Sequence, residues 1–362
     1  MKLKNILSVL LCGAFVLFLA AWCFFGPKQT YSESERRALA KFPEITWTNI
    51  SSGKFAGGFE EYATDAFPLR DFWRSVKAYT RLGVFAQNDN NDLFLKDGHI
   101  GKLEYPMQPN MMDYVAELFT KVYEENFPNA NVYFAMIPDK NMELADLKLD
   151  YAAFEKQMHE KLPFATPIQI SDLLTADDYY YTDTHWRQEK ITDVADRLAQ
   201  TMGTELSGEY EQVQLDVDFY GVYAGQSAMN PKPDTITVLK NETIDGLKVQ
   251  ILDVNSGMLK DSAVYDMGKA ESRDPYELFL SGNQPMVRIT NPANPSGKRL
   301  VIFRDSFGSS ITPLLAEGYS EIILLDLRYV NSSYVGKLVN FQNADVLFMY
   351  STLLLNNSLS MK

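Results

Sequence analysis

The sequence has few of the residues that bind metals or form disulfides. Its 362 residues include two cysteines, Cys12 and Cys23, and three histidines. Both cysteines lie near the N-terminus, which excludes a disulfide framework, a cysteine-rich zinc site and a cysteine nucleophile in the body of the chain. No two histidines stand at metal-ligand spacing, so we expect no histidine-rich metal site. No bound cofactor is expected either.

The chain also lacks an excess of positive charge. Its formal net charge is −13, and the acidic residues are spread along the chain instead of forming a tail. A nucleic-acid-binding protein needs a basic surface, so nucleic acid is not an expected partner. The composition, with 46% hydrophobic and 22% charged residues, is that of an ordinary globular protein.

One long apolar run is present, from Ile6 to Phe25, and Lys2 and Lys4 precede it. About 20 apolar residues are enough to cross a ~30 Å hydrocarbon core, whereas the apolar part of a cleaved signal peptide is usually only about 7–15 residues long. We therefore expect residues 1–26 to form an uncleaved signal anchor, a single transmembrane helix in the cell membrane. The lysines predict an N-terminus inside and a body outside the cytoplasm. A cleaved signal peptide and lipidation of Cys23 remain alternatives.

The rest of the chain is predicted to have two parts. Residues 27–88 look like a stalk with lead-in helices, and Pro68 divides the helical pattern over residues 55–85 into two helices. Residues 89–362 alternate buried strands with amphipathic helices. The expected strands are 131–137, 167–170, 299–303, 321–325 and 346–349, and the expected helices are 111–127, 151–162, 187–202 and 309–316. This order predicts an α/β domain with a mainly parallel sheet. Residues 203–297 have short alternating runs and many turn residues, which indicates a β-rich insertion or lobe.

The first candidate for chemistry is the run Asp183-Thr184-His185-Trp186, in a loop that leads into a helix. A carboxylate two residues before a histidine can orient the imidazole and stabilise its cationic form, as a general base requires. A packing or capping role for His185 at the helix start is the alternative. Of the other two histidines, we expect His99 to have a structural role and His159 to be a solvated surface residue.

The second candidate is the turn after the strand over 299–303, which contains Asp305, Ser306 and Gly308. A serine there lies at the carboxyl edge of the sheet, where α/β proteins bind ligands. Backbone N–H groups at the start of the following helix can hold an oxyanion. The alternative is that Asp305 or Ser306 only caps the helix. Together with His185, this turn could form a Ser-His-Asp arrangement by tertiary approach.

These motifs resemble the DHHW protein family of bacteria, which is similar to the SGNH-hydrolase-like domains of alginate O-acetyltransferases. The resemblance covers nearly all of the exported chain. It rests on segments that occur in the family's order: 32–43, 65–71, 183–186, 276–283, 304–307 and 325–329. It implies a three-layer SGNH-hydrolase-like fold with a circularly permuted motif order, since the serine follows the Asp/His pair. It also implies Ser306 as nucleophile, His185 as base and Asp183 as its orienting partner. Thr184 departs from the family name, which has a histidine there.

Four further residues are candidates for binding substrate or an oxyanion. Arg328 could hold a charged sugar or developing negative charge, or could simply pair with Asp326. Asn283 could donate its amide to an oxyanion, or serve a turn. Tyr181 and Trp186 could stack on sugar rings, or lie in the core.

The resemblance implies an extracytoplasmic O-acetyltransferase that acts on a cell-surface or secreted polysaccharide through an acyl-enzyme. The donor must reach the outside, so the resemblance also implies a membrane-bound O-acyltransferase as the partner that supplies the acetyl group. Two alternatives stay open. The same triad would serve a carbohydrate acetylesterase, with water as the acceptor. The protein could instead bind glycans or assist assembly, with a vestigial triad that catalyses no reaction.

Overall fold

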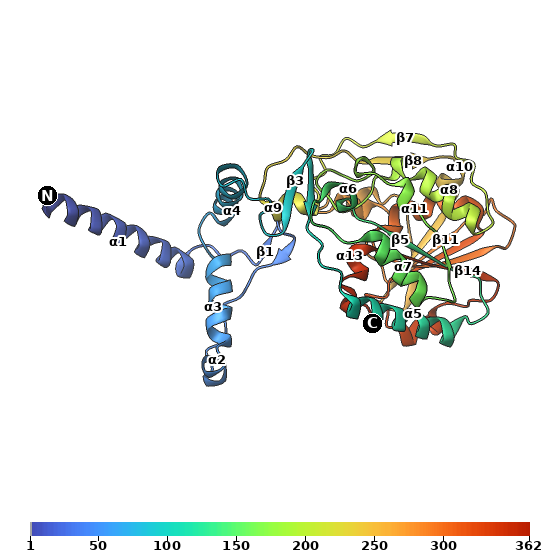
Figure 1. Cartoon of the computed structure of the whole chain (residues 1–362), viewed down its shortest axis with the longest axis horizontal. Helices are drawn as coiled ribbons and strands as arrows, with labels where there is room; N and C mark the ends of the chain where they lie inside the picture. The colour runs from blue at the N-terminus through green and yellow to red at the C-terminus, as the bar shows by residue number, and fades with distance from the viewer. Residues whose placement is uncertain (1) are drawn as a thin grey trace. The chain divides into compact units, whose positions relative to one another are not determined.

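The computed structural model describes residues 2–362 and separates into two compact units. The first unit contains the residues up to Leu93 together with Ala224–Pro231, and the second contains the remainder (Figure 1). The short segment 224–231 lies within the region predicted as a β-rich insertion, yet it belongs with the N-terminal residues. Sequence patterns did not predict this association.

The N-terminal unit begins with α1 (Lys2–Phe25) (Figure 1). By length and composition, Leu3–Phe25 is able to cross a membrane. The elements after it are β1 (Tyr31–Ser32), β2 (Arg37–Ala38), α2 (Trp47–Ser51), α3 (Lys54–Asp65) and α4 (Arg70–Tyr79), which continues as a π-helical turn over Thr80–Val84. The two helices predicted on either side of Pro68 are confirmed as α3 and α4.

The second unit is built around an eight-stranded mixed sheet with the order β10-β9-β11-β13-β12-β14-β5-β6. Its parallel part comprises β13 (Glu321–Leu325), β12 (Arg299–Arg304), β14 (Ala344–Ser351), β5 (Val132–Ile137) and β6 (Thr166–Pro167). The four longer strands, β13, β12, β14 and β5, are largely apolar and buried, as expected for parallel strands that are covered on both faces. The two-residue β6 is exposed at the edge. The mainly parallel α/β architecture predicted from the sequence is therefore confirmed.

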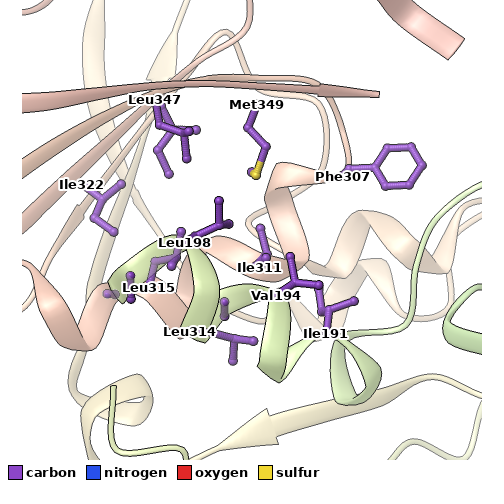
Figure 2. Close-up of a cluster of buried hydrophobic side chains, with 14 of the residues drawn as sticks. Ile191, Val194, Leu198, Phe307, Ile311, Leu314, Leu315, Ile322, Leu347 and Met349 are labelled. Atoms are coloured by element: carbon purple, nitrogen blue, oxygen red, sulfur yellow. The ribbon is translucent and has the colours of Figure 1, made fainter. Parts of the chain in front are cut away.

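Alternate residues of each central strand enter two separate cores. In β12, Leu300 and Ile302 face the core that contains α8 (Thr192–Thr201) and α11 (Gly308–Leu315). Figure 2 shows this core, with Leu198 and Ile311 beneath Leu347 and Met349. Val301 and Phe303 face the opposite core. That core contains α5 (Pro109–Asn126) and α7 (Tyr151–Lys161). The unit thus has a helix–sheet–helix arrangement.

The region predicted as a β-rich insertion or lobe is for the most part not a separate lobe. Its strands β9 (Lys248–Asp253), β10 (Met258–Ser262) and β11 (Met286–Thr290) extend the main sheet in antiparallel pairing. The α8/α11 core includes Val249, Val287 and Ile289. Burial of these side chains explains why β9 and β11 pair with the main sheet. Only β7 (Glu211–Gln214) and β8 (Thr237–Lys240) form a ladder of their own.

Two predicted elements are shorter than expected. The strand expected over 167–170 is reduced to Thr166–Pro167 in β6. The helix expected over 187–202 divides into a 3₁₀ turn (Gln188–Lys190) and α8. The reason is Gln188, whose buried side chain accepts from Leu239 N–H in β8 and donates to the Ser310 carbonyl. These bonds hold the turn apart from the helix.

The remaining elements are short. They include β3 (Leu93–Lys96) and β4 (His99–Lys102), which pair with each other, and the helices α6 (Asn141–Leu144), α9 (Val222–Ser227), α10 (Glu242–Gly246), α12 (Val335–Leu338) and α13 (Thr352–Leu355).

Candidate active site

Polar residues gather where three neighbouring parallel strands end. Asp305 follows β12, Ser351 ends β14, and Asp139 follows β5. Ser351 N–H donates to Asp305 Oδ2 at 2.8 Å, and the Thr352 hydroxyl donates to Asp139 Oδ2 at 3.0 Å. Ligand sites of open α/β sheets lie at this edge, so we expect the functional residues to lie near this polar network.

Three side chains from two distant parts of the sequence form a hydrogen-bonded chain at this edge. Asp183 Oδ1 lies 2.6 Å from His185 Nδ1, and His185 Nε2 lies 2.7 Å from Ser306 Oγ. A proton on Nδ1, shared with the carboxylate, leaves Nε2 as an acceptor for the serine hydroxyl. Asp183 and His185 are buried while Ser306 is only partly buried. The arrangement is chemically able to activate a serine hydroxyl.

The Asp183 carboxylate is held on both oxygens. Oδ2 accepts from Val222 N–H at 2.8 Å, and Oδ1 also accepts from the backbone N–H of His185 at 3.1 Å. Burial opposes ionisation of Asp183, but the charge of His185 and these hydrogen bonds together lower the pKa of the carboxyl below its ordinary value. The carboxylate is therefore ionised at neutral pH and fixed in orientation.

The imidazole ring rests on Tyr276, a residue that the sequence indicated only as part of the family-like segment 276–283. The two rings are stacked with their centroids 3.8 Å apart and an interplanar angle of 9°. The Tyr276 hydroxyl is 2.9 Å from Ser310 Oγ, in the first turns of α11. Tyr276 thus links the plane of the His185 ring to the helix that follows Ser306.

Trp186 does not fit the predicted role of a sugar-stacking residue. Its side chain is fully buried, and its indole N–H donates to Ser310 Oγ at 2.9 Å and to the Phe307 carbonyl at 3.1 Å. A buried ring cannot stack on a sugar, so the core alternative is correct for this residue. Tyr181 is 42% exposed and lies beside His99, with ring centroids 4.3 Å apart. Its proposed contact with substrate stays a prediction.

The turn that carries Ser306 is held by its neighbour Asp305. Asp305 Oδ1 accepts from Phe307 N–H at 3.1 Å and so stabilises the turn before α11, while the Ser306 hydroxyl faces His185. The N-cap residue of α11 is Phe307, which makes no side-chain capping bond, so the alternative that Asp305 or Ser306 only caps the helix is wrong. The Gly308 N–H donates to the Asp305 carbonyl at 3.1 Å and is therefore already used. The expected role of Gly308 as an oxyanion donor stays a prediction. A Cβ at Gly308 would lie 2.8 Å from Arg304 Cβ, which explains the glycine.

Arg328 and Asn283 come together at the end of β13. Arg328 pairs with the buried Asp326 through Nε at 2.9 Å and Nη2 at 2.6 Å, so the ion-pair alternative is present. Nη2 is also 3.3 Å from Asn283 Oδ1, which directs the amide oxygen toward the arginine. Within residues 2–362, no recorded hydrogen bond joins either side chain to the Asp183–His185–Ser306 chain. Their roles toward substrate stay predictions.

Lys140 is a site residue that sequence reasoning missed. It is buried after β5, and its ammonium donates to the carbonyl oxygens of Tyr180 at 2.8 Å, Tyr181 at 3.1 Å and Asp183 at 2.8 Å. Burial lowers the pKa of Lys140 to about 7, against the opposing charges of Asp183, Asp234 and Asp139. No sequence spacing connects Lys140 with a loop forty residues later, so no local signal could have revealed it.

The two other histidines lie outside the hydrogen-bonded chain. His99 is buried, as expected for a structural residue. His159 was predicted to be solvated, but it is partly buried with its ring 5.9 Å from Phe134, and burial lowers its pKa. The prediction failed because the helix α7 turns this residue toward the sheet.

Comparisons with known proteins support the fold. No family model and no curated protein matches the sequence. A DHHW family protein from Eubacterium siraeum has a similar structure, with a TM-score of 0.61, 19% identity, and coverage of 74% of this chain and 93% of that one. Bacillus cereus PatB1, in a structure with a sulfonyl adduct, has a TM-score of 0.58 and 19% identity over 73% of this chain and 95% of its own. The resemblance predicted from the motifs is thus confirmed at the level of the fold: this chain has the fold of a DHHW family protein.

Proposed function

We propose that this protein is an extracytoplasmic O-acetyltransferase that acts on a cell-surface or secreted polysaccharide. The observation that carries the proposal is the chain Asp183–His185–Ser306, with hydrogen-bond distances of 2.6 and 2.7 Å. The motif resemblance supports acyl transfer as the reaction, and the partial exposure of Ser306 supports access for a substrate.

The proposed reaction has two halves. In the first, Ser306 Oγ attacks the acetyl carbonyl of the donor while its proton passes to His185 Nε2. The tetrahedral intermediate then expels the donor's leaving group, which takes the proton back from His185, and an acetyl ester of Ser306 remains. In the second half, a sugar hydroxyl gives its proton to His185 and attacks this ester. Ser306 recovers the proton as the acetylated sugar departs.

The proposed location follows from α1. A helix able to span a membrane, preceded by lysines, supports a single-pass anchor with the N-terminus inside and the second unit outside. The acetyl donor must then reach the outer face, and the motif resemblance points to a membrane-bound O-acyltransferase as the partner that delivers it.

The test is turnover of an acetyl ester by the full chain in detergent, with and without oligosaccharide acceptors. Ser306→Ala and His185→Ala should each reduce turnover by at least about 10³-fold, because each removes a member of the catalytic unit. Ser309→Ala is the matched control, since Ser309 is buried at the start of α11, three residues after Ser306, and its hydroxyl has no hydrogen-bond partner within the described residues. Equal turnover by the wild type, both variants and the control would overturn the assignment.

A sulfonyl fluoride gives a second, activity-independent test of Ser306. A nucleophilic serine forms a sulfonate ester and releases fluoride, with His185 accepting the proton. PatB1 is known with a sulfonyl adduct, which makes such a reagent a natural choice here. We expect the added mass on the peptide that contains Ser306, and no added mass in Ser306→Ala.

The acetylesterase alternative predicts the same losses but yields free acetate even when acceptor is abundant. Acetylated oligosaccharide as the product distinguishes transfer from hydrolysis. The non-catalytic alternative predicts glycan binding that Ser306→Ala leaves unchanged, with no turnover in any form of the protein.

A further inference from the structure

Helix α4 (Arg70–Tyr79) exposes its large apolar side chains and turns its two arginines inward, unlike an ordinary surface helix. The apolar residues are exposed: Leu69, Phe72, Trp73, Val76 and Tyr79 have exposures between 39% and 74%. The arginines Arg70 and Arg74 are turned inward, with side chains 14% and 15% exposed. A surface helix normally buries its apolar stripe, so the exposed stripe here needs a partner.

Ion pairs fix this orientation. Arg70 pairs with Glu35 and lies 3.2 Å from Asp65 Oδ1, while Arg74 lies 3.3 Å from Glu35 Oε1. Arg74 also donates to the Gly225 carbonyl at 2.9 Å, within the same unit. Rolling α4 to bury the apolar stripe would break all of these contacts, so the outward stripe is a built feature of the N-terminal unit.

The residues that hold α4 come from two segments that the proposed reaction does not use, 32–43 and 65–71. Arg37 of the first segment makes a two-pronged ion pair with Asp65 of the second, with distances of 2.8 and 2.6 Å. These segments therefore serve to present the stripe, which gives them a role apart from catalysis.

The stripe lies close to the end of α1. The Tyr62 hydroxyl donates to the Cys23 carbonyl at 3.2 Å, and Phe24 packs against Phe59 with centroids 6.2 Å apart. An open cavity of about 680 Å³ is lined by Trp22 of α1 together with Leu69 and Phe72 of the stripe. The last turn of α1 and the stripe on α4 therefore line the same cavity, together with charged residues such as Asp65 and Arg70.

We propose that the exposed stripe of α4 lies in the interface of the lipid bilayer that α1 spans. The stripe contains Trp73, Tyr79 and Phe72, side chains of the kind that settle at the boundary between headgroups and acyl chains. The closeness to α1 brings the stripe to the membrane surface, so lipid is the occupant that this arrangement favours. The N-terminal unit is then held to the membrane by two contacts, α1 through the bilayer and α4 along it. The inference rests on the proposed anchoring by α1 but not on the proposed reaction.

The test places a nitroxide at Val76 in the full chain reconstituted into phosphatidylcholine vesicles. Cys12 and Cys23 are replaced by serine, and Val76→Cys is labelled, with Val254→Cys in the second unit as the exposed apolar control. We expect the Val76 label to be reached by oxygen far more than by a water-soluble nickel chelate, and the Val254 label to show the reverse. Equal access of the chelate to both labels would overturn the proposal.

A second measurement needs no label and no cysteine. The difference in tryptophan fluorescence between the wild type and Trp73→Phe isolates Trp73, because Trp22, Trp47 and Trp186 contribute to both proteins. Brominated phosphatidylcholine should quench this difference at least twofold. If the difference is not quenched, the lipid proposal is contradicted. The proposal is also contradicted if the nickel chelate reaches the Val76 label in pure lipid vesicles but not in native membranes. That result would assign the stripe to a protein partner. Ester turnover is unaffected by either outcome, so failure here is distinct from failure of the proposed reaction.

Discussion

Lys140 donates a hydrogen bond to the carbonyl oxygen of Asp183 at 2.8 Å, from a buried position directly after β5. The same ammonium binds the carbonyls of Tyr180 and Tyr181, so it fastens the loop in front of His185 to the edge of the sheet. Asp234 holds this loop as well, since its carboxylate accepts from the N–H groups of Tyr181 and Thr182, both at 2.8 Å. The position of His185 opposite Ser306 therefore depends on Lys140 and Asp234, which lie outside the Asp183–His185–Ser306 chain.

Replacing Lys140 by methionine should reduce ester turnover by about 10²-fold, because small displacements of a catalytic group are costly. The buried carbonyls of Tyr180 and Asp183 lose this donor, at roughly 1–3 kcal/mol each, while the Tyr181 carbonyl still accepts from Ile100 N–H at 2.8 Å. The cost of burying an ammonium disappears as well. We therefore expect a smaller change in stability than in activity, measured by kinetics and by denaturant unfolding. Lys156→Met, at an exposed position, is the control. Wild-type turnover in Lys140→Met would contradict a positioning role.

The lowered pKa of Lys140 predicts a pH dependence of stability. The folded lysine loses its proton near pH 7, whereas the unfolded lysine keeps it up to about 10.5. In this window the unfolded state binds more protons, so the free energy of unfolding rises with pH. We expect the wild type to gain stability relative to Lys140→Met as pH increases from 7 to 10.5. A constant difference between the two proteins would show that the lysine stays charged in the fold.

Gly221 should be intolerant of a side chain. A Cβ there would lie 2.4 Å from both Asp183 Cβ and the Thr182 carbonyl oxygen, which leaves no room without moving the loop. Gly221→Ala is expected to lower turnover by at least about 10²-fold through displacement of Asp183. Gly246→Ala is the matched control, since nothing lies within 4 Å of its added Cβ. Equal activity of both alanine variants would exclude this tight contact.

Asp183→Asn tests the orienting carboxylate. An amide carries no negative charge to stabilise an imidazolium, and its NH2 group can hold the imidazole in the wrong tautomer, so turnover should drop by about 10³–10⁴-fold. The sulfonyl fluoride reaction of Ser306 should slow in parallel. A drop in turnover with an unchanged labelling rate would mean that Asp183 acts elsewhere than on the serine.

The ion pair between Arg37 and Asp65 predicts acid sensitivity of the N-terminal unit. Burial of Asp65 opposes ionisation, but the hydrogen bond and charge of Arg37, with Arg70, lower its pKa below 3.8. This contribution to stability is complete above pH 3.8 and is lost as pH falls through the lower folded value. Asp65→Asn should cost about 1–3 kcal/mol at neutral pH and lose this acid dependence. Glu60→Gln, exposed on the same helix, should behave as wild type.

The regular part of the fold could be predicted because its signals are local. The apolar runs over 299–303 and 321–325 became β12 and β13 almost residue for residue, and Pro68 separates α3 from α4 as expected. The strands β9–β11 could not be assigned to the main sheet in this way. Their short alternating patterns indicate strands but say nothing about which edge they join.

In the candidate site, too, the residues with local sequence signals could be predicted and those that act through long-range contacts could not. Asp183, His185 and Ser306 could be named from the sequence because each lies in a short motif, although their catalytic roles stay predictions. Tyr276 and Lys140 could not be named, since each acts through contact with a residue far away in the chain. Trp186 was misjudged because its motif does not reveal that α11 covers its ring.

The sequence by itself determined the apolar N-terminal helix, the alternation of buried strands with amphipathic helices, and the acid, base and hydroxyl that an acyl transfer would require. Each of these depends on neighbouring residues and on periodicity. Only the tertiary structure decided that His185 meets Ser306, that Lys140 fastens the loop before it, and that α4 turns its arginines inward. Those outcomes depend on hydrogen bonds and ion pairs between residues tens to more than a hundred positions apart, and no local pattern encodes them.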